Sequence, residues 1–298
     1  MDGRHEQRQQ RKLNMSIAQQ PSIAILTTLY RGDSTQFFED AFASLQAQTY
    51  PRERTHVYIC VDGPIPKTHE LLLEKYSAQI HKVLRNPENM GIAAALNRGL
   101  DALDDETYVL RMDMDDLCDP QRFKSQVAFM EAHADIDLCG CNSIEIDSSG
   151  EEIYRRTYPA TDAEIKAVLH LCNPILHPTY CIRGDSLRNS RLRYRDRFLV
   201  EDLDFVLQCA KRGWKFHNLQ DFLFRWRLSS AFYNRRHSLK RAAAEFYVYT
   251  ECAWHTHRVD PRLVFPVVRF LFRLLPPAVT KRMYQSQYRN RVLGGSDR

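Results

Sequence analysis

The sequence lacks the features that would place it across a membrane, in the secretory route or among repeat proteins. No stretch reaches about 18 uninterrupted apolar residues, the length that indicates a membrane-spanning helix. Residues 1–20 are polar and contain no apolar signal-peptide core, so we expect a disordered tail there. The chain also shows no internal repeat and no low-complexity segment.

The eight cysteines are scattered and have neither the spacing of a zinc ribbon nor that of a secreted disulfide framework. Cys139 and Cys141 alternate along a predicted strand. We therefore expect buried free thiols and a reducing compartment.

What is present is the composition of a soluble globular protein, with 44% hydrophobic and 27% charged residues among 298. A chain of this length can form one large domain, or one domain with an appendage. Residues 222–298 carry 15 Lys and Arg against 4 Asp and Glu, a charge of +11, so residues 1–221 carry −6 of the total of +5. This division predicts two surfaces with different partners.

Strand and helix patterns alternate along the first part of the chain. Continuous apolar runs of strand type are separated by segments with helical periodicity, and a strand and an amphipathic helix follow later. The predicted strands are 22–30, 56–63, 81–86, 107–113 and 135–147. The predicted helices are 35–48, 68–78, 90–103 and one that begins at 201, ends at Gly213 and is followed by a short strand. This order is typical of a parallel sheet with crossover helices.

Polar residues follow three of these strands. Tyr30, Asp62 and Asp113 stand at or just beyond strand ends, and Asn89 lies in the next turn. Because ligands of open parallel sheets bind beyond the carboxyl ends of the strands, we expect these four segments to converge on one crevice.

The stretch "YVLRMDMDDLCDP" (108–120) gathers Asp113, Asp115 and Asp116 within four positions. Like charges this close repel unless a cation or donor groups neutralise them. A solvated turn is one interpretation, and a site for Mg²⁺ or Mn²⁺, which prefer oxygen ligands, is the other. A haloacid dehalogenase-type phosphatase fits less well, because its Asp-x-Asp follows the first strand and precedes a Thr-like residue.

Two further segments have both a structural and a functional interpretation. In 86–100, Gly91 begins a helix whose N–H groups can bind an anion, or whose small residues simply pack tightly on the sheet. In "FLVEDLDF" (198–205), Glu201 and Asp202 either stabilise a helix start or supply a general base.

Six pieces in order, over about residues 22–228, resemble the family 2 inverting glycosyltransferases: "TTLYRGD", "VDG", "NMGIAAALNRGL", "RMDMDD", "NPILHPT" and "VEDLDFVLQCAKRGWKF". The resemblance implies a GT-A fold, an α/β architecture with a Rossmann-like, mostly parallel sheet flanked by helices and a helical C-terminal extension. The implied organisation is a tail (1–20), a glycosyltransferase domain (21–230) and a basic helical C-terminal region (231–298).

The resemblance implies a donor site for a UDP-sugar. By resemblance, Tyr30 would stack near the uracil ring and Asp62 would accept a hydrogen bond from its N–H. Asn89, Gly91 and Asn97 would shape the rest of the donor pocket.

The resemblance also implies Mn²⁺ or Mg²⁺ as a cofactor. Asp115 would ligate the metal, Asp113 would contact the metal and the ribose, and Asp116 would orient the sugar or cap a helix. His177 would lie near the diphosphate or the metal, although a lone histidine is more often simply packed in the fold.

Asp202 would be the catalytic base of a single inverting displacement, with Glu201 as an acceptor-side or structural partner. The opening "TTLYRGD" departs from the family's more usual "PVYN", so the first loop is expected to differ. "LFRWRLSS" (223–230) lacks the Gln of the "QxxRW" motif of processive synthases, so transfer of one sugar at a time is expected. Arg225 and Arg227 are expected either to face the phosphates of the donor or to lie as charged residues on an edge strand, where they would prevent pairing with another strand.

The segment 260–277 is apolar with interspersed arginines, too short and charged to span a bilayer. It predicts a helix lying on anionic lipid, the alternative being a helix packed on the domain. Nucleic acid is not an expected partner, since no recognition motif accompanies the basic residues. The expected role is therefore transfer to a saccharide or lipid-linked acceptor, peripherally at the cytoplasmic face of the membrane; a non-catalytic, membrane-associated scaffold that keeps the nucleotide-binding fold is the alternative.

Overall fold

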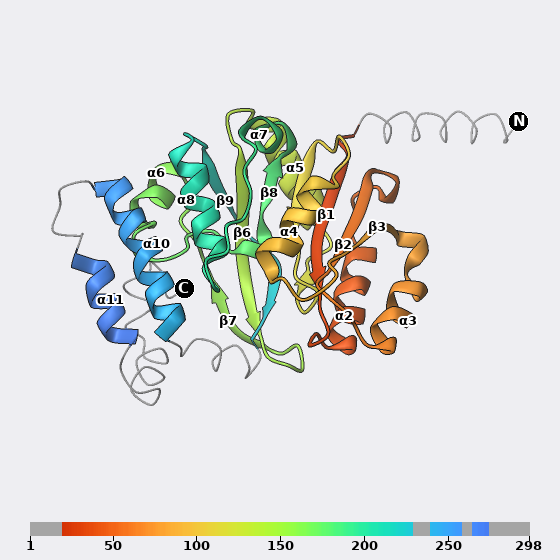
Figure 1. The fold of residues 1–298 in the computed structure, drawn as a ribbon. Helices are drawn as coiled ribbons and strands as arrows, with labels where there is room; N and C mark the ends of the chain where they lie inside the picture. Colours follow the sequence, from red (N-terminus) through yellow and green to blue (C-terminus); the bar gives the residue numbers. More distant parts are fainter. Residues whose placement is uncertain (1–19, 229–238, 258–263, 274–298) are drawn as a thin grey trace, which may run out of the picture.

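The computed structural model describes residues 20–228, 239–257 and 264–273 (Figure 1). The tail predicted over residues 1–20 lies outside this range except for its last position. Of the C-terminal region, the structure describes two helices, and of the segment 260–277 it describes residues 264–273.

Within the described residues the strands form one nine-stranded sheet in the order β3-β2-β1-β4-β8-β6-β9-β5, with β7 paired to β6 (Figure 1). The first four in this order run parallel, as the alternating pattern predicts. They are β1 (Ile23–Leu29), β2 (Thr55–Val61), β3 (Ile80–Arg85) and β4 (Tyr108–Arg111).

Alternate residues of these strands face two different helical layers. On one face, Ile23 and Ile25 pack in a cluster with Phe38 and Phe42 of α2 (Thr35–Gln46). On the other face, Leu26 packs in a cluster with residues of α4 (Ile92–Asp101). Because both faces are covered, β1 is buried almost throughout, which is why its sequence is an unbroken apolar run.

The second half of the sheet is mixed, since β6 is parallel to β9 but antiparallel to β7 and β8. The alternation over 135–147 predicted a half-buried strand, but β6 is buried along its whole length, because other strands flank it and clusters cover both its faces. The strands and helices of this second half are β5 (Leu117–Cys118), α5 (Arg122–Ala132), β6 (Leu138–Ile146), β7 (Glu152–Arg156), α6 (Asp162–Val168), β8 (Cys181–Arg183), α7 (Gly184–Ser190), α8 (Glu201–Lys211) and β9 (Phe216–Arg227). The remaining helix of the first half is α3 (Lys67–Lys75), and short 3₁₀ turns are η1 (Arg52–Arg54), η2 (Ser77–Gln79) and η3 (His177–Thr179).

Two C-terminal helices, α10 (Leu239–His257) and α11 (Phe265–Arg273), lie beyond α8 at the end of the molecule opposite to α3 (Figure 1). Val248 and Cys252 of α10 belong to the same apolar cluster as α8. Arg269 of α11 donates to Glu245 of α10 at 3.2 Å. None of the described helices has the length and apolar character that crossing a membrane requires.

All eight cysteines are free, and all except Cys172 are buried, which confirms the interpretation as buried thiols. Cys139 and Cys181 stand opposite each other on neighbouring strands without a disulfide.

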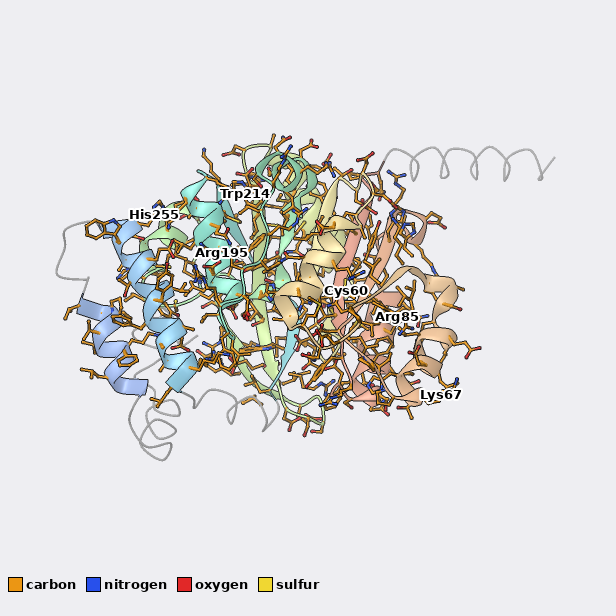
Figure 2. All side chains as sticks on the ribbon, in the orientation of Figure 1. Cys60, Lys67, Arg85, Arg195, Trp214 and His255 are labelled. Atoms are coloured by element: carbon orange, nitrogen blue, oxygen red, sulfur yellow. The ribbon has the colours of Figure 1, made fainter. Side chains whose placement is uncertain are left out.

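Gly99 is required where α4 crosses β1 and β2. A Cβ at this position would lie 2.2 Å from Leu26 Cδ1 and 2.7 Å from the sulfur of Cys60. Cys60 is labelled in Figure 2. Leu26 is 2% exposed and Cys60 is 0% exposed, so neither has room to move.

We expect Gly99→Ala to lower the free energy of unfolding by about 1–3 kcal/mol, although alanine favours helix more than glycine. Chemical denaturation measures the change. Leu26→Val in the same chain shortens the colliding side chain, so the double variant should lose less than the sum of the single losses. Strict additivity would contradict the close approach.

Candidate active site

The parallel strands bring the predicted polar residues to one edge of the sheet. Leu29 pairs with Val61 and Leu26 pairs with Arg111, so the segments that begin at Tyr30, Asp62 and Met112 leave the sheet side by side. The backbone continues the ladder, with Asp62 N donating to Leu29 O at 2.8 Å.

Asp62 is buried and holds the segment that precedes α4. Its Oδ1 accepts from Asn86 Nδ2 at 2.8 Å and from Met90 N at 2.9 Å, and its Oδ2 accepts from Gly91 N at 2.9 Å. Gly91 has φ of +89°, which favours glycine. The carboxylate of Asp62 therefore binds the N–H groups just before α4, whereas no side chain caps the helix itself at Gly91.

The other predicted donor residues take different positions. Tyr30 is exposed, its N–H donates to Asp33 Oδ2 at 2.8 Å, and its ring lies over Gly32. Asn89 is exposed beside this edge. Asn97 instead clamps a distant loop, because its amide both donates to Tyr194 O and accepts from Tyr194 N at 2.8 Å.

Asp113, Asp115 and Asp116 each offer an oxygen within 4.8 Å of the others, and their burial increases from exposed Asp115 through Asp113 to buried Asp116. Asp116 Oδ1 accepts from Arg227 N at 2.7 Å, whereas the buried Oδ2 has no hydrogen-bond partner. Burial, and then Asp115 and Asp113, raise the pKa of Asp116 well above its usual range. Three converging carboxylates with one orphaned oxygen fit a hard divalent cation, which would neutralise this repulsion.

The interpretation of Asp116 as a helix cap is wrong. The next helix, α5, begins at Arg122 with Gln121 as its N-cap residue. Asp116 lies in the turn before β5, where the backbone of β9 binds it.

Two buried arginines support the turn that contains Asp113, Asp115 and Asp116, which we call the acidic turn. The sequence did not predict where these arginines lie. Arg111 donates to the carboxylate of Asp113 and to the carbonyl of Met112. Arg227 donates from Nε to Asp115 O at 2.9 Å and from Nη1 to Ser148 O at 3.1 Å. Its side chain is 3% exposed, so it lies beneath the turn rather than guarding an edge. For both residues, the sequence feature that could have indicated a buried supporting role is an arginine at the end of an apolar run.

Asp202 stands in the first turn of α8 and is partly exposed. Its Oδ2 accepts from Asn173 Nδ2 at 2.8 Å, a partner that the sequence did not single out although it begins the "NPILHPT" motif. The neighbouring Glu201 is buried and accepts from Leu199 N at 2.9 Å. Phe198 and Leu199 have φ of 43° and 66°, so Glu201 stabilises a strained turn.

His177 belongs to an aromatic group between the acidic turn and α8, which we call the aromatic bridge: His177, Tyr180, Tyr194 and Phe205. His177 Nε2 lies 3.0 Å from Tyr194 Oη, and Tyr194 stacks on Phe205 of α8 at 4.4 Å between ring centroids. Burial, and then Arg111, hold the pKa of His177 well below its usual value, so the ring is neutral near pH 7. The group of three carboxylates does not include His177, whose role as a ligand stays a prediction.

Comparison with known sequences gives a consistent result. The family model described as "Glycosyl transferase family 2" matches residues 25–189. An uncharacterized glycosyltransferase of Haemophilus influenzae is 30% identical over 276 residues, covering 89% of this chain and 98% of the relative. The amylovoran biosynthesis glycosyltransferase AmsE of Erwinia amylovora is 28% identical, covering 88% and 98%. An Escherichia coli protein named UDP-Gal:alpha-D-GlcNAc-diphosphoundecaprenol beta-1,3-galactosyltransferase is 24% identical, covering 90% and 97%.

Solved structures show the same fold. TarS of S. aureus in complex with UDP-GlcNAc gives a TM-score of 0.60 at 16% identity, covering 85% of this chain and 82% of that one. The mannosyltransferase PcManGT of Pyrobaculum calidifontis, in complex with GDP-Man and Mn²⁺, gives 0.61 at 13% identity, covering 90% and 80%. These likenesses confirm the predicted GT-A fold.

We expect Arg227→Met to lower the free energy of unfolding by about 3 kcal/mol, because buried carbonyl oxygens lose their charged donor. Chemical denaturation measures the loss. Arg225→Met is the matched control, since Arg225 is exposed on the same strand and its loss should change stability by less than about 0.5 kcal/mol. Equal losses in the two variants would contradict the supporting role of Arg227.

Proposed function

The chain belongs to glycosyl transferase family 2, and on this premise we propose that it transfers a single sugar from a UDP-sugar, with inversion, to a saccharide or lipid-linked saccharide acceptor. The observation that carries the proposal is the orphaned Oδ2 of buried Asp116 within the three-carboxylate turn. A buried carboxylate that lacks a partner is costly, and a divalent cation would supply one.

In the proposed mechanism Asp115, Asp113 and Asp116 would hold Mn²⁺ or Mg²⁺. When bound, the ion neutralises the diphosphate as charge builds on the departing UDP. Arg111 keeps the Asp113 carboxylate oriented, and Arg227 holds the turn from beneath.

Asp202 accepts the proton of the acceptor hydroxyl while that oxygen attacks the anomeric carbon and the bond to UDP breaks. One displacement of this kind inverts the anomeric configuration. Asn173 fixes Oδ2 of Asp202 and so restrains the rotation of the carboxylate. Glu201 acts through the strained turn rather than on substrate.

The donor proposal assigns the nucleotide to the edge formed by Tyr30, Asp62, Asn89 and Gly91. Exposed Tyr30 offers a ring for stacking, and Asp62 keeps the 86–91 segment in place. Asn97 contributes indirectly by clamping Tyr194. UDP is supported by the name of the Escherichia coli relative and by the UDP-GlcNAc complex of TarS, whereas the GDP-Man complex of PcManGT makes GDP the competitor to test.

A membrane surface completes the proposal, with the protein peripheral at the cytoplasmic face. α11 packs against α10 through Arg269 and Phe270. Its outer side leaves Val264, Val268 and Leu271 more than half exposed, at the spacing of one helical face. The charge of +11 over residues 222–298 favours anionic lipid. The relative whose name includes a diphosphoundecaprenol acceptor supports a lipid-linked substrate.

We expect Asp202→Asn to reduce transfer by about 10²–10⁴-fold, the usual contribution of a general base. UDP with Mn²⁺ should still raise the melting temperature of this variant as in the wild type, since a ligand that binds only the folded state stabilises it. Sugar transfer from labelled UDP-sugars and thermal shift with UDP, GDP, CDP and TDP, each with and without Mn²⁺, measure the two properties.

Asp185→Asn, which alters an exposed carboxylate on α7, is the control and should remain active. Full activity of Asp202→Asn would refute the base assignment. If no nucleotide shifts the melting temperature of folded wild-type protein, the donor proposal fails and the scaffold alternative is favoured.

We expect Val268→Glu to weaken binding to vesicles of phosphatidylglycerol and phosphatidylcholine by about tenfold, because a charge replaces an apolar contact with lipid. Co-sedimentation measures the bound fraction. Leu71→Glu is the matched control, since Leu71 is exposed on α3 at the other end of the molecule. Equal binding by wild type and Val268→Glu would contradict the assignment of α11 to the membrane surface.

A further inference from the structure

We propose that His56, His81 and Glu106 form a binding site for a Zn²⁺-class ion, separate from the acidic turn. One ligand atom from each of the three lies within 4.8 Å of the others. Imidazole nitrogen and carboxylate oxygen together suit Zn²⁺, whereas the oxygen-only set of the acidic turn suits Mg²⁺ or Mn²⁺.

The topology places the two sites at opposite edges of the sheet. His56 and His81 are each the second residue of a strand, in β2 and β3, and Glu106 lies just before β4. Asp62 and Asp113 follow the far ends of β2 and β4. A seven-residue strand with a rise of about 3.3 Å per residue separates the two edges by about 20 Å. The histidine site is therefore independent of the proposed transfer chemistry.

The orphaned oxygen of Glu106 is the observation that points to a ligand. Glu106 is 1% exposed, and its buried Oε2 has no hydrogen-bond partner. Its Oε1 accepts from Tyr58 Oη at 2.5 Å and lies 2.8 Å from His56 Nδ1. A carboxylate half-satisfied in this way is unfavourable in an apolar surrounding, and a bound cation would satisfy it.

The spacing between His56 and Glu106 is close to what an ion requires. Bonds of about 2.0–2.1 Å to a tetrahedral Zn²⁺ separate two ligand atoms by about 3.3 Å. His56 Nδ1 and Glu106 Oε1 are 2.8 Å apart, so a small opening lets the ion take the place of the proton between them. An ion held by both oxygens of the carboxylate would also give the orphaned Oε2 its partner. With Nδ1 bound to the ion, the His56 ring carries its proton on Nε2, since the ligand nitrogen must be unprotonated.

His81 has the arrangement of a metal ligand that is oriented by a carboxylate. Its Nε2 lies 2.8 Å from Asp104 Oδ2, which leaves Nδ1 as the coordinating nitrogen. Carboxylates that bind the second ring nitrogen in this way fix the tautomer and make the ligand more basic. Lys82 pairs with the same aspartate and keeps it charged.

One rearrangement is required. The rings of His56 and His81 stack with centroids 4.5 Å apart and planes 16° apart, whereas a nitrogen lone pair points along its ring plane. The His81 ring must therefore turn toward the ion. Its side chain is 34% exposed, so the turn exchanges surface contacts with solvent and disturbs no core packing.

Binding of the ion would link three segments of the fold. The ion would join the start of β2, the start of β3 and the loop before β4, which are far apart in the sequence. Because it binds the folded state alone, it should stabilise the parallel half of the sheet.

Isothermal titration of the chelator-treated full chain with ZnCl₂ tests the proposal, in an Asp115→Asn background that weakens the acidic turn. We expect one saturable Zn²⁺ equivalent, a higher melting temperature with Zn²⁺, and the visible absorption of tetrahedral Co²⁺ when Co²⁺ replaces it. His81→Ala should weaken Zn²⁺ binding at least tenfold and abolish the Co²⁺ absorption. His133→Ala, which removes another exposed histidine, is the control and should bind as the background chain does.

His81 is exposed, so the His81→Ala chain is expected to fold, and circular dichroism verifies this. The proposal is overturned if the folded background chain binds no Zn²⁺ saturably, or if His81→Ala binds it as tightly as the control. Zn²⁺ binding that disappears with His133→Ala instead would also overturn it.

Discussion

The mutual repulsion of three carboxylates in one turn is the constraint on which the site depends. Asp113, Asp115 and Asp116 converge where β4 leaves the sheet, and burial of Asp116 removes the water that would screen them. Arg111 pairs with the carboxylate of Asp113, and Arg227 holds the main chain of the turn from beneath. Because both arginines are buried, the turn keeps its shape while its outer carboxylates remain exposed to a ligand.

The same physical device is found in two loops: a carboxylate accepts backbone N–H groups and fixes the loop before a helix. Asp62 does this for the segment before α4, and Glu201 does it for the strained turn before α8. The aromatic bridge then connects η3 to α8, because Tyr194 contacts His177 on one side and Phe205 of α8 on the other. Tyr194 is also bound by Asn97 of α4.

The sequence predicted the parts of this arrangement that depend on local pattern. Apolar runs located the parallel strands, and the rule that ligands bind at their carboxyl ends brought Tyr30, Asp62 and Asp113 together. It did not predict contacts between distant segments, such as Asn97 with Tyr194 or Arg227 with Asp116, which are 97 and 111 residues apart. The roles predicted for Asn97 and Asp116 were therefore inferred from the sequence motifs around them, whereas their hydrogen-bond partners in the structure come from distant segments.

The position of α8 depends on residues beyond the family-matched range, which ends at residue 189. Asp204 is completely buried two residues after Asp202, and it pairs with Arg195 and Arg197 from the preceding loop. Glu251 of α10 binds Lys211 at the other end of α8, and Glu251 also lies 3.8 Å from Arg195. Arg195 is labelled in Figure 2, close to α8. A displacement of α10 would expose this network and leave the buried charge of Asp204 less well compensated, so the first turn of α8 would shift with it. α11 packs on α10 through Arg269 and Glu245, so a chain of contacts leads from α11 to the helix whose first turn contains Asp202.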